Sequence, residues 1–317
     1  MQVLRHPRAG DPGLTRTVLT LGNFDGVHRG HQAILERTIA LARAHDARAG
    51  LVTFHPHPAV VVSPGRAPEL IVPLRGKLAL LAATELDFVW LARFTPEFAR
   101  LTPEAFIGTY LGARVGIVAM VVGDNVSFGR NRTGNADVLR RLGERYGFRV
   151  DVVGPVTHAG VRVSSTAVRA AIREGDVTMA TGLLGRCHRL WGRVGSGDRR
   201  GRTLGFPTAN LVLRAGLLPR DGVYVVRARV HEATYGGVAN VGSRPTFGGQ
   251  RRGLEAHLLD FDGDLYRRQL CVELVARLRD EMRFPSVDAL VRQIGEDAKR
   301  ARQVLAADAR PSRDVRP

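Results

Sequence analysis

The chain has 317 residues, of which 44% are hydrophobic, and this is enough for about two domains that each bury a core. Its formal net charge is +17, but the only lysines are Lys77 and Lys299, so the charge comes almost entirely from arginines scattered along the chain. No basic stretch alternates with aromatic residues, no apolar run approaches the ~20 residues of a membrane-spanning helix, and the first residues, MQVLRHPRAGDPG, lack the apolar core of a secretion signal. We therefore expect a cytoplasmic protein with no nucleic-acid or membrane partner.

The first half of the chain alternates short apolar runs with amphipathic stretches. The predicted strands are 17–22, 49–54, 88–92, 117–123 and 148–154, and the predicted helices are 31–45, 74–84, 102–112 and 136–147. This alternation predicts a parallel sheet with helices on both faces. Ligands of such folds bind at the carboxyl ends of the strands.

A glycine-rich motif, GNFDGVHRGH, follows the first of these strands at residues 22–31. His28 and His31 lie at the start of a predicted helix, where free backbone amides and the positive end of the helix dipole suit a polyanion. A strand-to-helix turn with two surface histidines is an alternative interpretation. A metal site that adds His55 and His57 is another, although the carboxylates usual in metal hydrolases are not evident.

Two short helices are expected before the pattern changes at residue 185. The segment 163–169 opens the first, which runs through Ile172 after a serine or threonine cap, and the second spans about 178–184 and ends at Gly185. The later apolar runs, at 189–197, 208–213, 222–230, 235–242, 254–261 and 269–278, are separated by turns without helices, which predicts an antiparallel barrel or sandwich. A helix over 286–307 and a disordered tail at 309–317 complete the chain.

The two cysteines, Cys187 and Cys271, are too few for a disulfide framework or a thiolate metal site. We interpret both as small buried apolar residues. A second glycine-rich stretch, GSGDRRGRTLG at 195–205, precedes the predicted strand at 208–213. Its glycine amides and arginines suit phosphate oxygens, although it is not a Walker loop, and a plain hairpin turn is the alternative.

Longer motifs carry a family resemblance. The 22–31 decapeptide, together with Ser165-Thr166-Ala167-Val168-Arg169, resembles the nucleotidyltransferases that join a phosphate ester to the α-phosphorus of ATP. The runs GDRRGRTLGFPTANL, LPRDGVY, GVANVGSRPTF and LEAHLLDF look like riboflavin kinase. From about residue 15 to 305 the chain therefore resembles the bacterial bifunctional riboflavin kinase and FAD synthetase family.

The resemblance implies two domains and two reactions. Residues 1–184 would form a Rossmann-like FAD synthetase (FMN adenylyltransferase) domain, and residues 185–308 a β-barrel riboflavin kinase domain with a terminal helix. The barrel would phosphorylate riboflavin to FMN with ATP and Mg²⁺, and the first domain would adenylylate FMN to FAD and release pyrophosphate. The alternatives are an enzyme in which one module is only a scaffold or regulator, and a non-catalytic flavin or nucleic-acid binder.

In the first domain, the resemblance assigns the ATP phosphates to His28 and His31 and the leaving pyrophosphate to Ser165, Thr166 and Arg169. The residues it adds to the nucleotide loop are Gly22, Phe24, Asp25 and Gly30. It places the flavin against Phe54, His57, Pro58 and Asn125, because flat aromatic and proline faces suit the isoalloxazine ring.

In the second domain, the resemblance implies that Thr208 and Asn210 hold Mg²⁺ and ATP phosphates and that Glu255 is the general base. Around them, the phosphate loop would include Gly201, Arg202, Gly205 and Pro207, and Arg279 belongs to a stretch that folds over the flavin. The chain departs from the family at Cys187-His188 and at Arg267, which stands where glycine is usual. The expected partners are small molecules alone, with a monomeric or weakly homo-oligomeric protein.

Overall fold

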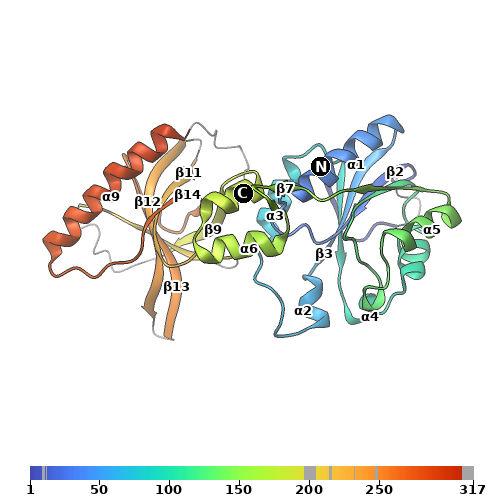
Figure 1. Ribbon diagram of the computed structural model, residues 1–317, viewed down its shortest axis with the longest axis horizontal. Helices are drawn as coiled ribbons and strands as arrows, with labels where there is room; N and C mark the ends of the chain where they lie inside the picture. Colours follow the sequence, from blue (N-terminus) through green and yellow to red (C-terminus); the bar gives the residue numbers. More distant parts are fainter. Residues whose placement is uncertain are drawn as a thin grey trace. The chain divides into compact units, whose positions relative to one another are not determined.

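The structure, a computed structural model, describes residues 1–8, 11, 13–195, 205–213, 216–231, 233–246 and 249–308. The chain forms two compact units (Figure 1). The first comprises Met1–Glu69 and Lys77–Val163, and the second Leu70–Gly76 and Ser164–Pro317. Gly201, Arg202 and the predicted tail at 309–317 lie outside the described residues. The predicted boundary between residues 184 and 185 separates the two expected enzyme activities, and it stays a prediction.

The first unit is built on a six-stranded parallel sheet, as the alternation of strands and helices predicts. Its strands are β1 (Gln2–Leu4), β2 (Thr17–Leu21), β3 (Arg48–His55), β4 (Phe88–Arg93), β5 (Ile117–Gly123) and β6 (Arg149–Val153), in the order β1-β4-β3-β2-β5-β6. All five residues of β2 are buried, because β2 lies inside the sheet and both of its faces are covered. The sequence does not predict β1, which has only three residues and is largely exposed.

Helices cover both faces of this sheet. The helical segments between β2 and β6 are α1 (Arg29–Ala44), α2 (Pro58–Val62), α3 (Leu74–Ala82), α4 (Pro96–Ala99), η1 (Ala105–Leu111), η2 (Arg130–Arg132) and α5 (Ala136–Tyr146), and the short strands β7 (Thr157–His158) and β8 (Val161–Arg162) follow β6. Leu19 of β2 packs into the core that contains η1 and α5, whereas α1 contacts β2, β3 and β5 with residues outside that core. Since alternate residues of a strand face opposite sides, α1 covers the other face.

The segment predicted as a helix at 102–112 forms a π-helix, η1, instead of a regular α-helix. Gly108 and Gly112 weaken the preference of this segment for the regular helix. A Cβ atom at Gly108 would lie 2.6 Å from Cζ of Tyr146, so this glycine allows α5 to pack closely against η1.

The second unit contains two short helices and a closed antiparallel barrel. The helices are α6 (Ser165–Glu174) and α7 (Val177–Leu184); the strands are β9 (His188–Gly195), β10 (Ala209–Leu213), β11 (Gly222–Val230), β12 (Ala233–Thr246), β13 (Gly249–Leu258) and β14 (Gln269–Arg279). They close in the order β10-β13-β12-β11-β14-β9, which confirms the predicted barrel. Inward side chains such as Leu190, Tyr224 and Leu254 fill its interior.

The last helix, α9 (Val287–Ala307), covers part of the outside of the barrel. It contacts β11, β12 and β14, and Ala298 and Ala301 of α9 pack against Val225 and Val275 of the barrel. Ser286 caps the helix, with its Oγ accepting the amide of Ala289 at 3.2 Å, as the sequence predicts.

The two departures from the family pattern have local explanations in the barrel. His188 is fully buried and its Nε2 lies 2.8 Å from the carbonyl oxygen of Leu217, and burial lowers the pKa of His188 to about 4. Arg267 has a φ of +61°, so the chain keeps a left-handed turn there without the usual glycine. Cys187 is buried and Cys271 partly so, no disulfide joins them, and burial raises the pKa of Cys271 to about 12.

Two candidate active sites

The first candidate site lies where the order of the parallel strands reverses. From β2 the chain adds β3 and β4 on one side, then returns to add β5 and β6 on the other. The 22–31 motif follows the carboxyl end of β2, and Asn125 follows the carboxyl end of β5, which pairs with β2. Such a reversal opens a crevice at the carboxyl ends of the strands, where α/β sheets bind ligands.

Two stacked histidines occupy this position. His28 caps α1, and its Nδ1 accepts the backbone amide of His31 at 3.3 Å. The two imidazole centroids are 3.6 Å apart with an interplanar angle of 15°, and the ring of Phe24 stacks on His31 at 4.5 Å. A Cβ atom at Gly30 would lie 3.3 Å from the His28 ring, so this glycine leaves room for the stack.

The backbone of the turn is unusual for its sequence. Phe24 and Val27 both have positive φ angles, +48° and +43°, although neither is a glycine. Gly22 and Gly26 also have positive φ angles, and the side chain of Asp25 is buried. Strained residues of this kind persist where surrounding contacts hold them, often at ligand sites.

The imidazole of His31 is uncharged at neutral pH. Burial lowers its pKa well below the usual value, and the neighbouring His28 and Lys77 lower it further. The buried Nδ1 of His31 has no hydrogen-bond partner within the described part of the chain. Because buried polar atoms are normally paired, this atom fits a site that is completed by a ligand.

Lys77 of α3 also lies at this site, although the sequence motifs do not predict it. Its Nζ donates to the carbonyl oxygen of Asn23 and to Oγ1 of Thr53, each at 3.0 Å. The only signal in the sequence is the scarcity of lysine, since Lys77 is one of two in the chain.

The residues predicted to hold the flavin lie at the ends of β3 and β5. Phe54, the penultimate residue of β3, makes an edge contact with Phe94 at 5.6 Å. His57 caps α2, with Nδ1 accepting the amide of Ala59 at 3.2 Å, and Pro58 is the first residue of that helix. Asn125 is exposed, and its Oδ1 lies near Gly123 at the end of β5.

The alternative metal site is not supported. Among the described residues, no three His, Cys, Asp or Glu side chains are grouped so that they could hold a metal ion. The Nδ1 atoms of His28 and His57 both accept backbone amides instead.

Ser165, Thr166 and Arg169 occupy the first turns of α6 in the second unit. Ser164 caps this helix through its Oγ, which accepts the amide of Ala167 at 3.1 Å. Arg169 is buried, whereas Thr166 is exposed. Free backbone amides and the hydroxyl groups at a helix start suit an anionic group.

The second candidate site is a row of polar side chains across the barrel. Glu255 of β13 lies directly opposite Asn210 of β10 and also opposite Asn240 of β12. Their strand neighbours, such as Leu254 and Ala239, fill the barrel interior, so these three side chains point outward. Directly opposite residues have Cβ atoms about 5 Å apart, which places a carboxylate between two amides.

The same row continues to β14. Asn240 pairs with Val223 of β11, which pairs with Arg279. Asn240 donates from Nδ2 to Oε1 of Glu281 at 3.0 Å, so the segment after β14 reaches across to β12. Asn240 belongs to the GVANVGSRPTF motif, but only the register of the strands places it beside Glu255.

Arg279 makes a structural contact in addition to its predicted flavin role. Its Nη2 lies 2.7 Å from Oδ2 of Asp297, and its Nε lies 3.1 Å from both carboxylate oxygens. Two parallel bonds of this kind hold α9 to the end of β14.

The segment before β10 is fixed to β13. Nδ1 of His257 lies 2.9 Å from the carbonyl oxygen of Pro207, and the rings of His257 and Phe206 make an edge contact at 5.4 Å. Gly205 has a φ of +82°, a conformation that favours glycine. Thr208 follows Pro207 directly, so these contacts hold it next to the Asn210–Glu255 pair.

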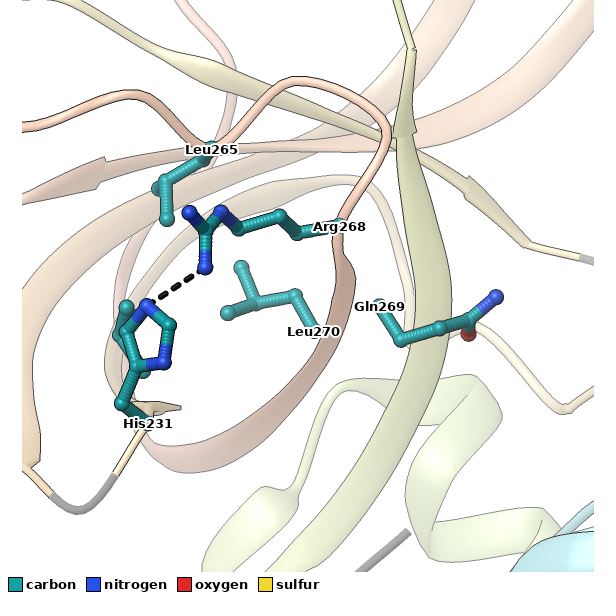
Figure 2. Close-up of a pocket in the computed structure, with 6 residues that line it drawn as sticks. His231, Leu265, Arg268, Gln269 and Leu270 are labelled. Carbon is teal, nitrogen blue, oxygen red and sulfur yellow. Dashed lines mark hydrogen bonds between the residues drawn. The ribbon is translucent and has the colours of Figure 1, made fainter.

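A pocket of about 260 Å³ opens near the end of β9 (Figure 2). Val230, Leu265 and Leu270 provide apolar walls, and His231, Arg268 and Gln269 provide polar groups. Nη1 of Arg268 lies 2.5 Å from Nε2 of His231. Gln269 pairs with Arg193 of β9, two residues before Gly195, which in turn pairs with Asn210. The end of β9 therefore connects this pocket with the polar row.

Comparisons with known proteins divide the chain in the same way. The family model for FAD synthetase matches residues 11–167, and the family model for riboflavin kinase matches residues 184–305. Two curated relatives are both named bifunctional riboflavin kinase/FMN adenylyltransferase. The Escherichia coli K12 relative is 42% identical and the match covers 90% of this chain and 92% of the relative; the Pseudomonas fluorescens relative is 39% identical and the match covers 98% and 99%.

A solved structure has the same fold over nearly the whole chain. It is described as a macrolide-efflux protein from Streptococcus pneumoniae, is 33% identical, and superposes with a TM-score of 0.86 over 95% of this chain and 99% of its own. Neither family model describes efflux. Within the described residues, no helix combines the length and apolar character needed to cross a membrane.

Proposed function

Because the chain belongs to the family of bifunctional riboflavin kinase/FMN adenylyltransferases, we propose that its two reactions take place at the two sites described above. The protein phosphorylates riboflavin to FMN and joins FMN to the adenylyl group of ATP to form FAD. We assign adenylyl transfer to the crevice at β2 and β5, and riboflavin phosphorylation to the polar row of the barrel. The extents of the two family matches support this assignment and a functional boundary near residue 184.

The observation that carries the kinase assignment is the placement of Glu255 between Asn210 and Asn240. In phosphorylation, the ribityl 5′-hydroxyl gives its proton to Glu255, its oxygen bonds to the γ-phosphorus, and ADP leaves. Asn210 and Asn240 orient the carboxylate and the polar groups of the substrates. The segment 205–208, fixed by His257, holds Thr208 beside the reacting groups.

Thr208 and Asn210 would hold Mg²⁺. Hydroxyl, amide and carboxylate oxygens suit this ion, which binds few protein ligands and completes its shell with water and phosphate oxygens. When bound, Mg²⁺ neutralises charge on the phosphates. The residues present therefore fit the ion, and omission of magnesium from the kinase assay should abolish FMN formation.

The pocket beside β9 is our proposed place for the nucleoside of ATP in the kinase reaction. Its apolar walls suit a flat base, and the polar groups of His231 and Arg268 can bond to its edge or to the ribose. Its connection to Asn210 through the end of β9 supports this assignment. Leu265→Trp should raise the KM for ATP in FMN formation and leave the KM for ATP in FAD formation unchanged.

Adenylyl transfer needs alignment more than a side-chain nucleophile. A phosphate oxygen of FMN bonds to the α-phosphorus of ATP while the bond to the β-phosphate oxygen breaks. The uncharged His31 and its stacked neighbour His28 donate hydrogen bonds to the phosphates. Ser165, Thr166 and Arg169 would hold the pyrophosphate that leaves, and the flavin would lie against Phe54, His57, Pro58 and Asn125.

One assay tests both assignments. The pure protein is incubated with riboflavin, ATP and Mg²⁺, and the flavins are separated over time. We expect FMN followed by FAD. His28→Ala should stop FAD formation and spare FMN formation. Asn210→Ala should stop FMN formation but leave supplied FMN convertible to FAD. Loss of both activities in either variant would contradict independent sites.

We also propose a cytoplasmic location and a monomeric or weakly self-associating protein. Both reactions consume ATP, which supports the location. Sedimentation of the pure protein over a range of concentrations tests the second proposal, which a concentration-independent oligomer would exclude.

A further inference from the structure

Lys77 closes a small buried network in the first unit. Its side chain is only 8% exposed, and its Nζ donates to the carbonyl oxygen of Asn23 and to Oγ1 of Thr53, each at 3.0 Å. Thr53 in turn donates from Oγ1 to the same Asn23 carbonyl at 3.1 Å. The network therefore joins α3, β3 and the turn after β2.

The carbonyl held by this network belongs to the peptide that opens the phosphate turn. The next residue, Phe24, has a φ of +48°, and its ring stacks on His31, which stacks on His28. A shift of the Asn23–Phe24 peptide would displace Phe24 and disturb the stacked histidines. Lys77 and Thr53 thus restrain the backbone from which this stack is built.

The network is electrostatically costly for a purely structural role. Both hydrogen-bond acceptors of the ammonium are neutral oxygens, and burial of the charge is costly even though the Asp25 carboxylate offsets part of that cost. Burial lowers the pKa of Lys77 to about 8, while Asp25 acts in the opposite direction. An uncharged side chain of similar length would fill the space at lower cost, so the charge itself points to a function.

The ionisable groups around Lys77 come from three elements. Asp25 in the turn after β2 favours the ammonium, whereas His31 of α1 and His55 of β3 have their own pKa values lowered partly by Lys77. His28 acts on His31 in the same direction. Because the imidazoles of His31 and His55 are held uncharged, they add no positive charge to this turn near neutral pH, whereas the ammonium of Lys77 does.

We propose that Lys77 is a positioning residue for adenylyl transfer: its ammonium fixes the Asn23–Phe24 peptide and places a positive charge behind the turn that receives the ATP phosphates. This inference rests on the assignment of adenylyl transfer to that turn.

The test uses the full chain, because riboflavin phosphorylation then serves as an internal control. Lys77→Met should lower kcat/KM for conversion of FMN to FAD by at least ten-fold, leave FMN formation within two-fold, and leave the unfolding temperature unchanged or higher. Lys299→Met, which removes the other lysine from an exposed position on α9, is the matched control and should change neither reaction. FAD formation within two-fold of the wild type in Lys77→Met would overturn the proposal.

A pH profile separates charge from packing. Between pH 7 and 10, wild-type FAD formation should decline as Lys77 loses its proton near pH 8, whereas phosphate groups complete their ionisation near pH 6. The decline should vanish in Lys77→Met and move to higher pH in Lys77→Arg, which should also recover part of the lost activity. A decline that persists unchanged in Lys77→Met would contradict the proposal.

Two further variants keep the test decisive. If Lys77→Met does not fold, Thr53→Val removes one partner of the ammonium with little change of volume, and we expect a smaller loss of FAD formation. No loss in Thr53→Val would then count against the network. His28→Ala shows which proposal fails. If His28→Ala leaves FAD formation intact, the assignment of adenylyl transfer to this turn is wrong. If His28→Ala stops FAD formation but the Lys77 variants do not change it, only the inference about Lys77 is wrong.

Discussion

The two sites proposed to bind phosphate groups lie on different kinds of scaffold. The first lies at the carboxyl ends of parallel strands, and its working groups are largely buried: a capped helix start, two stacked imidazoles and a buried ammonium. The second lies on the outer surface of a closed antiparallel barrel, where Asn210, Asn240 and Glu255 are partly or fully exposed. Burial strengthens the electrostatic interactions of the groups at the first site. At the second site, the register of the paired strands brings the polar side chains together.

This difference has a chemical counterpart. Adenylyl transfer starts from a phosphate that is already ionised, so hydrogen-bond donors and fixed positive charges are sufficient to align it. Phosphorylation starts from a hydroxyl group, which needs a base that is charged at neutral pH, and an accessible carboxylate meets that need. A buried carboxylate would have a raised pKa and would be a different kind of base.

The sharpest test of this comparison is Glu255→Gln. The amide keeps the shape of the side chain and removes the base, so the rate of FMN formation should fall by about 10²–10⁴-fold. Conversion of supplied FMN to FAD should remain within two-fold, measured by separation of the flavins. A parallel loss of both reactions would show that the sites are not independent.

The buried His188 tests whether the barrel holds an imidazole in the uncharged form for stability alone. His188 of the barrel is buried in the uncharged form, with a pKa of about 4 against 6.5 in the unfolded chain. Because the unfolded state binds the proton more tightly between these values, the free energy of unfolding should rise with pH from 4 to 6.5, by about 3 kcal/mol in total. His188→Gln should remove this part of the pH dependence in urea unfolding curves without changing FAD formation at neutral pH. An unchanged pH dependence would show that His188 does not titrate in this way.

Asn240→Ala tests the row that the barrel register creates. Loss of one hydrogen bond near the base should lower kcat/KM for riboflavin by about ten-fold, equivalent to roughly 1.4 kcal/mol. Asn240→Asp is the companion variant, because a second carboxylate beside Glu255 should move the acidic limb of the kinase pH profile. If neither variant affects FMN formation, Asn240 has no part in the site.

Arg267→Gly is expected to have the smallest effect. The φ of +61° at Arg267 is unfavourable for a residue with a side chain, and glycine should relieve up to about 1 kcal/mol of strain. The unfolding midpoint should therefore stay level or rise slightly. A marked loss of stability would mean that the arginine side chain makes a contribution larger than the strain.

The sequence predicts the elements well where periodicity and caps agree. The apolar run at 17–22 becomes β2, and the predicted helices that begin near residue 164 and at 286 form, capped by Ser164 and Ser286. The π-helix η1 was not predicted, because the apolar spacing of this segment fits an ordinary α-helix.

The sites were predicted less completely, for a physical reason. Local motifs identify His28, His31 and Glu255, but Lys77 lies 54 residues from the Asn23 carbonyl that it holds. Asn240 joins Glu255 only through the register of β12 and β13. Long-range contacts of this kind have no local signature in a single sequence.

The state of the two cysteines has a practical consequence for watching the enzyme at work. Cys187 is buried, and the thiol of Cys271 is held protonated with a pKa of about 12, so neither should react readily with maleimides near pH 7. The native chain is thus a nearly silent background for thiol labelling. Cysteines introduced at Val62 and at Lys299, one exposed position in each unit, would accept a donor and acceptor dye pair. Energy transfer between the dyes would report whether the two units change their separation as riboflavin is converted to FMN and then to FAD.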